Sequence, residues 1–139
     1  MKKGDLFEYA TIRIVPLVER EEFINTGVIL YCKAQNFLEM KFEVDEKRLS
    51  SFSNNINIGE ITQHLEAFCK ICGGTEDSGE IGKLSMPERF RWLTGSRSTI
   101  IQSSKVHPGL CEDAGVFGMR ANLSLQSRAQ NRGHGLMRP

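Results

Sequence analysis

The stretch that decides the fold runs from residue 24 to residue 44 and reads INTGVILYCKAQNFLEMKFEV. Its first nine residues become apolar on both faces, which is typical of a central strand covered on both sides. Its last eight residues alternate, with apolar side chains at every second position from Leu38 to Val44. The four residues between these runs have a turn-like composition. The stretch therefore predicts a β-hairpin.

The flanking sequence adds one strand before the hairpin and helices after it. Residues 7–15 alternate and predict a half-buried strand, which Pro16 ends because proline donates no backbone hydrogen bond. Residues 46–52 predict a short helix. Residues 57–72 predict a longer one, begun by a capping box at Asn57 and stopped by Gly73 and Gly74. A second capping box at Ser85 predicts a helix through Thr94.

Three further segments complete the ordered part of the chain. Residues 99–102 predict a short strand, residues 75–83 a polar loop, and residues 105–113 an irregular segment with a turn at Pro108 and Gly109. Hairpin-linked strands followed by helices favour an α+β fold. We expect an antiparallel sheet of about four strands, with an N-terminal meander, packed on one side by two to three helices.

The charge distribution predicts one domain followed by a tail. Residues 114–139 contain four arginines and no acidic residue, so this segment carries +4 while residues 1–113 carry −3. We expect residues 1–113 to form a single α+β domain. The segment 114–139 is basic, rich in Gly and Arg, and low in hydrophobicity, which favours a poorly ordered tail. Only this tail suggests nucleic-acid binding.

Composition indicates a cytoplasmic protein that does not span a membrane. No apolar run approaches the roughly 20 residues that a membrane helix needs, and no apolar segment follows Lys2 and Lys3 as in a signal peptide. Four cysteines without an export signal indicate reduced thiols. Cys69 and Cys72 lie within an amphipathic helix and not on the turn of a zinc knuckle, which favours core thiols over zinc. We expect no metal and no cofactor.

The candidate binding residues follow the helix that contains Trp92, the only tryptophan. Arg97, Ser98 and Thr99 bring a guanidinium and two hydroxyls together, and these groups suit a phosphate or a carboxylate. His107 adds a donor or a general base. In the alternative interpretation the hydroxyls satisfy turn amides and Arg97 pairs with a carboxylate, that of Glu22 or Glu43. Trp92 itself is expected to pack its helix against the sheet, together with Phe90 and Leu93.

Enzymatic motifs are scarce. The run from Glu19 to Glu22 brings carboxylates close together, and such groups bind divalent metals or share protons, but a charge run on a connector is usually a solvated loop. There is no Walker loop, dinucleotide fingerprint, Gly-x-Ser-x-Gly or zinc-protease helix. These absences weaken the case for the commonest enzyme classes.

Several separated motifs carry a resemblance to a known family. They read YATIRIVP at 9–16, EREEFINTGV at 19–28 and RFRWLTGSRST at 89–99, and continue through Gln102, Ser104, Val106-His107 and Gly109-Leu110-Cys111. Together they cover about residues 6–113, and in this order they resemble the bacterial domain of unknown function 3037. The resemblance implies small cytoplasmic proteins with no established activity, some of them encoded beside HipA-like kinases. It also implies a recurring set of polar positions: Arg13, Glu22, Asn25, Arg97, Ser98, Thr99, Gln102 and His107.

The chain departs from that pattern at its end, where similar sequences continue with an amphipathic helix. The missing helix would leave apolar surface exposed, which favours a homodimer or a less stable fold. The leading hypothesis is a binding or accessory module whose surface engages an anionic ligand or a partner protein. Its ligand-binding residues are Arg97, Ser98, Thr99, Gln102, Arg13 and Asn25. The alternative is an enzyme acting on a phosphate-containing or nucleic-acid substrate, with His107 as base and Glu22 as metal ligand or orienting group.

Overall fold

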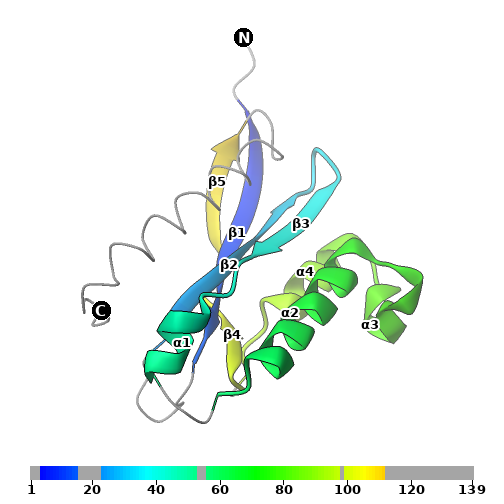
Figure 1. Cartoon of the computed structure of the whole chain (residues 1–139). Helices are drawn as coiled ribbons and strands as arrows, with labels where there is room; N and C mark the ends of the chain where they lie inside the picture. Colours follow the sequence, from blue (N-terminus) through cyan, green and yellow to red (C-terminus); the bar gives the residue numbers. More distant parts are fainter. Residues whose placement is uncertain (1–3, 16–22, 53–55, 98, 112–139) are drawn as a thin grey trace.

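The computed structural model describes residues 4–15, 23–52, 56–97 and 99–111. In these residues the strands are β1 (Asp5–Ile14), β2 (Ile24–Cys32), β3 (Phe37–Phe42), β4 (Ile101–Ser103) and β5 (His107–Cys111). The helices are α1 (Glu46–Phe52), α2 (Ile58–Gly73), the 3-10 turn η2 (Glu76–Ser78), α3 (Gly79–Gly82) and α4 (Met86–Leu93). The chain has the α+β fold that the sequence predicts, and Figure 1 shows its strands and helices as separate layers. The predicted tail, 114–139, lies outside the described residues.

All strand pairs in the sheet are antiparallel, in the order β3-β2-β1-β4, and β5 also pairs with β1. Tyr9 pairs with Leu30 of β2 and with His107 of β5, so β5 lies on the edge of β1 opposite β2. β4 therefore follows the same edge of β1 farther along, as Figure 1 shows. β1 therefore pairs directly with three strands: β2, β4 and β5.

The main core lies between one face of the sheet and the helices. Ala10, Ile12 and Ile14 alternate along β1 and are fully or almost fully buried against Leu65 of α2 and Leu93 of α4. Burying an aliphatic side chain of this size contributes about 1.5 to 3 kcal/mol, so this row accounts for much of the attachment of the helices to the sheet. Figure 1 shows α2 and α4 side by side, with α3 farther from the strands.

The helix ends form as the local sequence predicts. The Asn57 side chain accepts a hydrogen bond from the backbone N–H of Glu60 at 3.0 Å. α2 ends where Gly74 adopts the left-handed conformation, with φ at 64°. Ser85 and Glu88 form a reciprocal capping box at the start of α4. These groups satisfy backbone donors and acceptors that the helix itself leaves unpaired.

Two segments differ from their predictions. Residues 75–83 contain η2 and α3 in place of a loop, and residues 105–113 contain β5 in place of an irregular segment. Pro108 is accommodated because β5 is an edge strand, where a missing N–H interrupts no ladder. Gly109 is needed because the Phe7 ring occupies the space where a Cβ would lie. The pairing thus depends on a residue a hundred positions away, which local composition does not reveal.

The other face of the sheet carries a second, smaller apolar cluster, formed by strand residues only. Phe7, Leu30 and Cys32 are buried there, and Tyr9 and Phe37 pack against them. We call this side of the sheet the second face. None of the helices in the described part of the chain is both long and apolar enough to cross a bilayer.

Candidate functional site

The ladder between β1 and β2 is interrupted beside Arg13. Ile12 pairs with Gly27 and Arg13 pairs with Asn25, so Thr26 is left without a partner on β1. Thr26 instead donates its hydroxyl to the backbone carbonyl of Glu43 at 2.6 Å. Such a bulge bends its strand and redirects side chains, and bulges are enriched next to functional sites.

The opposite edge of β1 is interrupted at the same level. Ser103 of β4 pairs with Ile12 and His107 of β5 pairs with Tyr9, so the three residues between β4 and β5 lie opposite two residues of β1. Ser104 bridges this gap, because its hydroxyl accepts the backbone N–H of Thr11 at 2.9 Å, and its own N–H donates to the Thr11 carbonyl at 2.9 Å. Ser104 is not among the predicted site residues, because a serine that replaces a ladder acceptor has no distinctive local pattern.

Three of the predicted ligand-binding residues lie side by side next to these irregularities. Arg13 pairs with Asn25 of β2 on one side and with Gln102 of β4 on the other. Directly paired residues project from the same face with their Cβ atoms about 4.5 to 5.5 Å apart. Arg13 alternates with the helix-facing Ile12 and Ile14, so this set, which we call the Arg13 row, lies on the second face.

The Arg13 guanidinium has few partners of its own. It lies 4.0 Å from the centroid of the Phe23 ring, and its Nη2 is 3.4 Å from the Thr11 hydroxyl oxygen. No carboxylate among the described residues pairs with it. Burial lowers the pKa of Arg13, because desolvation penalises the charged form, although an arginine remains protonated in proteins. A charged group held on an aromatic ring, with no counterion among the residues that the structure describes, is the main electrostatic feature of the site.

Two polar atoms of the row are buried and have no hydrogen-bond partner: Nε of Arg13 and Oδ1 of Asn25. Leaving a buried donor or acceptor unpaired costs about 1 to 3 kcal/mol. Phe23 and Thr11, which the sequence analysis did not nominate, hold the guanidinium in place. Thr11 lies two residues from Arg13 and Phe23 lies two residues from Asn25. The two-residue period of a strand, which puts such residues on the same face, could therefore have identified them.

Arg97 lies on the helical layer and not in the Arg13 row. Its Nη2 donates to the carbonyl of Trp92 at 2.6 Å, and its guanidinium carbon lies 4.7 Å from the Trp92 ring centroid and 5.1 Å from that of Phe68. No carboxylate of the described residues pairs with it, so Glu43 is not the partner considered above. The Trp92 ring packs on the Phe68 ring of α2, with 5.9 Å between their centroids, although packing on the sheet was predicted. Phe90 and Leu93 are buried in the main core, as predicted.

Thr99 and Gln102 are linked to each other. The Thr99 hydroxyl donates to the carbonyl of Ile101 at 2.9 Å, and Gln102 donates its side-chain amide to the carbonyl of Thr99 at 2.9 Å. Thr99 is exposed and precedes the first residue of β4, Ile101, by two positions. Ser98 and Glu22 lie outside the described residues.

The segment that contains these groups matches a family model. Residues 9–116 match the model described as Protein of unknown function (DUF3037). The chain belongs to this family. No curated protein and no solved structure matches the sequence. The resemblance drawn from the separated motifs is thereby confirmed, and the DUF3037 segment includes the whole Arg13 row as well as Arg97.

His107 lies at a different level of the DUF3037 segment from the Arg13 row. It is exposed, pairs with Tyr9, and its ring lies 5.4 Å from the Tyr9 ring. Tyr9 precedes Arg13 by four residues on β1, which at roughly 3.3 Å per residue places the two pairs about 13 Å apart. His107 and Arg13 therefore do not contact the same small group.

The thiols of the DUF3037 segment are held in its interior. Cys32 and Cys72 are buried and Cys69 is half-buried, as the sequence predicts. Burial raises the pKa of the Cys72 thiol to about 12 and also raises that of Cys69. Among the described residues no group of three or more His, Cys, Asp or Glu side chains is arranged to hold a metal. The side chain of Cys111 is outside the described set.

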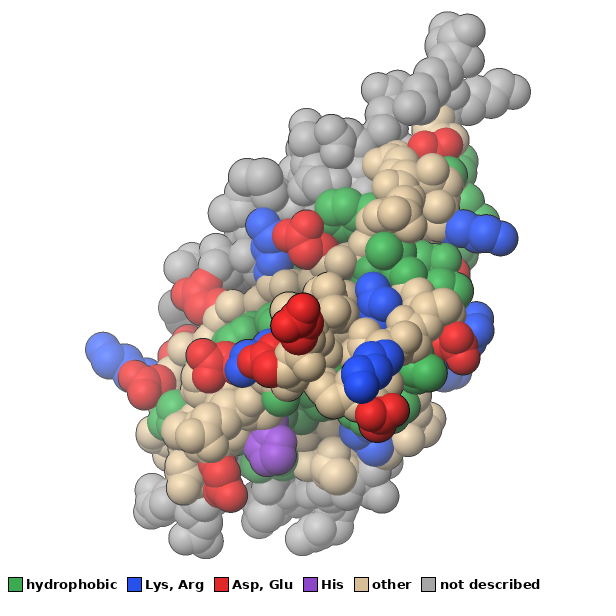
Figure 2. Space-filling model, turned by 90° about the vertical axis from the view of Figure 1, so that its right-hand side faces the viewer, with side chains coloured by type: hydrophobic (Ala, Val, Ile, Leu, Met, Phe, Trp, Pro, Cys, Tyr) green, Lys and Arg blue, Asp and Glu red, His purple; other side chains and the backbone are tan. Residues whose placement is uncertain are grey.

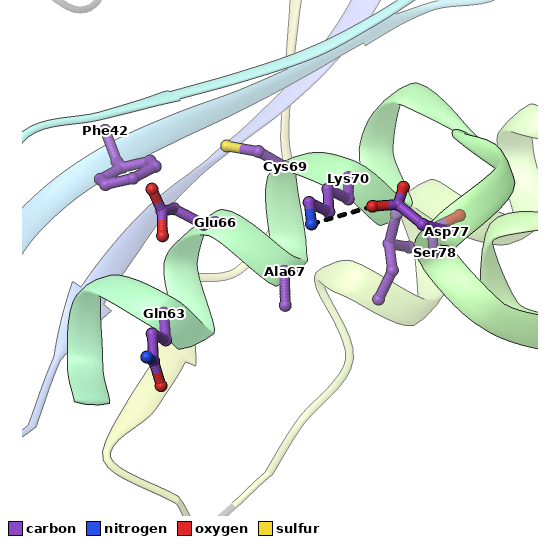
Figure 3. A pocket seen from close by; sticks show the side chains of 9 residues that line it. Phe42, Gln63, Glu66, Ala67, Cys69, Lys70, Asp77 and Ser78 are labelled. Carbon is purple, nitrogen blue, oxygen red and sulfur yellow. Dashed lines mark ion pairs between the residues drawn. The ribbon is translucent and has the colours of Figure 1, made fainter. Parts of the chain in front are cut away.

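A pocket of about 690 Å³ lies between α2, β3 and η2, away from all the nominated residues. Figure 3 shows the Lys70 ammonium and the Asp77 carboxylate turned toward each other across one end of it, and these groups form an ion pair at 2.9 Å. The Thr75 hydroxyl also donates to Asp77 at 2.7 Å. Since these charges satisfy one another, the pocket offers a ligand less unpaired charge than the Arg13 row does.

Proposed function

We propose that this protein is a binding module whose Arg13 row receives an anionic group, a carboxylate or a phosphate, from a ligand or from a partner protein. The observation that carries the proposal is the half-buried Arg13 guanidinium, which has no carboxylate partner in the described residues. A protein that uses an arginine only as a brace generally pairs it, because an unpaired half-buried charge is costly. A site that awaits an anion leaves it unpaired.

The surroundings of Arg13 suit this role. The Phe23 ring covers one face of the guanidinium, which fixes the plane in which its paired N–H donors point. A carboxylate or phosphate that approaches along this plane accepts two parallel hydrogen bonds. Asn25 and Gln102 flank the guanidinium with amide groups that discriminate between ligands by their own hydrogen bonds. Thr99 adjoins this surface through the hydrogen bond from the Gln102 amide, whereas Arg97 lies apart on the helical layer and Ser98 lies outside the described residues.

The enzyme alternative has no comparable support in the described residues. It requires His107 to meet the substrate at the anion site, yet His107 stacks on Tyr9 at another level of β1. A general base has to lie within hydrogen-bond reach of the proton it removes. We therefore propose binding without chemistry, in the cytoplasm. A protein partner, such as the HipA-like kinases implied by the resemblance, would supply the anion from one of its side chains.

Thermal-shift measurements with wild-type protein and two variants test the proposal. Inorganic phosphate, nucleotides, phosphosugars and dicarboxylates are screened, because a ligand that binds only the folded state raises the melting temperature. At one hundred times its dissociation constant a ligand adds about 2.7 kcal/mol. We expect this shift to be lost in Arg13→Met and retained in Arg91→Met, a matched change at an exposed arginine on α4.

The screen contradicts the proposal if an anion that stabilises the wild type stabilises Arg13→Met equally. If no compound shifts the melting temperature, the anion has to come from a protein. The proteins that co-purify with the wild type and with Arg13→Met from the native cell are then compared. The proposal requires at least one partner that the wild type retains and the variant loses. An identical set of partners for both proteins would rule out the Arg13 row as the binding site.

A further inference from the structure

A second guanidinium without a carboxylate partner in the described residues lies on the helical layer, against two aromatic rings. Arg97 lies 4.7 Å from the Trp92 ring and 5.1 Å from the Phe68 ring, and the two rings meet edge to face at 5.9 Å. We call these three side chains the Arg97 stack. Trp92 remains 37% exposed, which is unusual for a residue of this size and leaves one side of the stack accessible.

The described part of the chain does not neutralise the charge of the stack. An arginine has five N–H donors, and the one hydrogen bond that Arg97 makes with the described residues goes to the Trp92 carbonyl. No carboxylate of those residues pairs with it, although desolvation already disfavours its charge. A carboxylate brought by another molecule would supply the missing counterion.

We infer that the Arg97 stack is a docking site for an acidic segment of a partner protein. An Asp or Glu carboxylate of the segment pairs with Arg97, and an adjacent apolar side chain packs on the exposed part of Trp92. Charge complementarity identifies the occupant, because the stack combines one unpaired cation with exposed aromatic surface. Tryptophan and arginine also dominate the energetics of protein interfaces, and stacking on two rings reduces the rotamer entropy that Arg97 loses on binding.

A nucleic acid fits this surface less well. Binding a phosphate backbone requires several Lys and Arg side chains arranged as a continuous patch. Figure 2, which views the molecule from the helical side, shows basic and acidic side chains interspersed, with no broad region of positive charge. A single guanidinium beside aromatic rings therefore suits one carboxylate of a protein better than a polyanion.

A peptide-display library provides the probes for this inference. Random peptides are selected on the wild-type protein, and the enriched peptides are then synthesised and measured against three variants: Arg97→Gln, Arg97→Lys and the control Arg91→Gln. Arg91 is exposed on the same helix and lies outside the stack, so its change removes the same charge without touching the rings. Because Trp92 is the only tryptophan, its fluorescence reports binding at the stack directly.

We expect the enriched peptides to share an Asp or Glu next to an apolar residue and to change the Trp92 emission. Their dissociation constants should rise about tenfold or more in Arg97→Gln, which corresponds to one ordinary charged contact. Arg97→Lys should show a smaller loss, because it keeps the charge without the planar stack. The dissociation constants should stay unchanged in Arg91→Gln, so the loss in Arg97→Gln reports contact with the stack and not the net charge of the protein.

The inference is overturned if no acidic peptides are enriched, or if the enriched peptides bind Arg97→Gln as tightly as the wild type. It is equally overturned if binding leaves the Trp92 emission unchanged, since contact with the ring is part of the inference. This last readout uses wild-type protein alone. It therefore decides even if Arg97→Gln lowers the melting temperature too far for a comparison.

Discussion

Arg13 and Asn25 lie directly opposite each other on β1 and β2, and each has one buried polar atom without a hydrogen-bond partner. The donor is Nε of the guanidinium and the acceptor is Oδ1 of the carboxamide. The bulge at Thr26 shifts the register of the two strands beside this pair. The pair is thus a place where the fold sacrifices stability, which is common at sites that bind something.

The first prediction concerns a carboxylate placed beside the guanidinium. Asn25→Asp is nearly isosteric and supplies a counterion, which Arg13 does not have among the described residues, so we expect the free energy of unfolding at pH 7 to rise by about 1 kcal/mol. The new carboxyl should have a folded-state pKa below its unfolded value of about 3.9. The gain is therefore present above that pH and disappears on acidification. Urea titrations at pH 7 and pH 3 measure it.

Asn36→Asp is the control for this variant. Asn36 is exposed in the turn between β2 and β3, so the same chemical change there should leave stability almost unaltered. The carboxylate of Asn25→Asp, unlike that of the control, should also occupy the proposed anion site and abolish the ligand-induced thermal shift. An Asn25→Asp protein that is less stable than the wild type would show that Arg13 does not accept a carboxylate from this side.

A second prediction separates a binding arginine from a bracing one. Arg13→Met removes an unpaired buried donor whose presence costs about 1 to 3 kcal/mol, and the thioether keeps a contact with Phe23. We expect this variant to be at least as stable as the wild type. Arg97→Met should lose about 1 kcal/mol, because Arg97 caps the Trp92 carbonyl and stacks on two rings. Chemical denaturation measures the free energy of unfolding of both variants. If Arg13→Met loses more stability than Arg97→Met, Arg13 is a bracing residue and not a binding one.

The third prediction tests the packing of β5 on β1. A Cβ at Gly109 would overlap the Phe7 ring, so Gly109→Ala should destabilise the protein by about 1 to 3 kcal/mol. Gly73→Ala is the control, since its Cβ meets only a Thr75 methyl group at 3.7 Å and alanine favours a helix. Thermal unfolding of both variants measures the difference. Equal melting temperatures of the two variants would mean that Gly109 of β5 does not pack against the Phe7 ring.

A fourth prediction follows from the capping box of α4. Hydrogen bonds from the Ser85 hydroxyl and backbone N–H hold the pKa of Glu88 below its ordinary value. A carboxyl with a depressed folded-state pKa stabilises the protein above its unfolded pKa of about 4.3. The contribution is lost as the pH falls through the folded value. We expect Ser85→Ala to flatten this acid dependence between pH 5 and pH 3, and an unchanged slope would contradict the role of the box.

The fifth prediction concerns Cys72, whose pKa burial raises to about 12. The folded protein keeps this thiol protonated where an unfolded chain begins to ionise, near pH 8.5. Stability should therefore fall as the pH rises above that value. At pH 8, alkylation of Cys72 by iodoacetamide should proceed only through unfolding, which mass spectrometry measures with and without urea. Rapid modification of the native protein would show that the thiol is accessible.

Local sequence predicted the two longer helices, α2 and α4, and their ends, but not the short helices η2 and α3. The capping residues Asn57 and Ser85 and the left-handed Gly74 act on backbone groups within four residues, so their pattern can be interpreted without knowing the rest of the chain. The alternation in β1 likewise placed Ile12 with the core and Arg13 on the other face. The family resemblance nominated Asn25 and Gln102, but it did not say which residues meet.

Only the tertiary structure decided how the nominated residues divide. Asn25 and Gln102 reach Arg13 because β2 and β4 pair with opposite edges of β1, whereas Arg97 joins Phe68 because α4 packs beside α2. Strand pairing and bulges depend on hydrogen bonds between residues far apart in the chain, and a register shift of one residue moves every side chain to the other face. Sequence alone therefore nominated most of these polar side chains, and long-range pairing separated them into the Arg13 row on the sheet and the Arg97 stack on the helices.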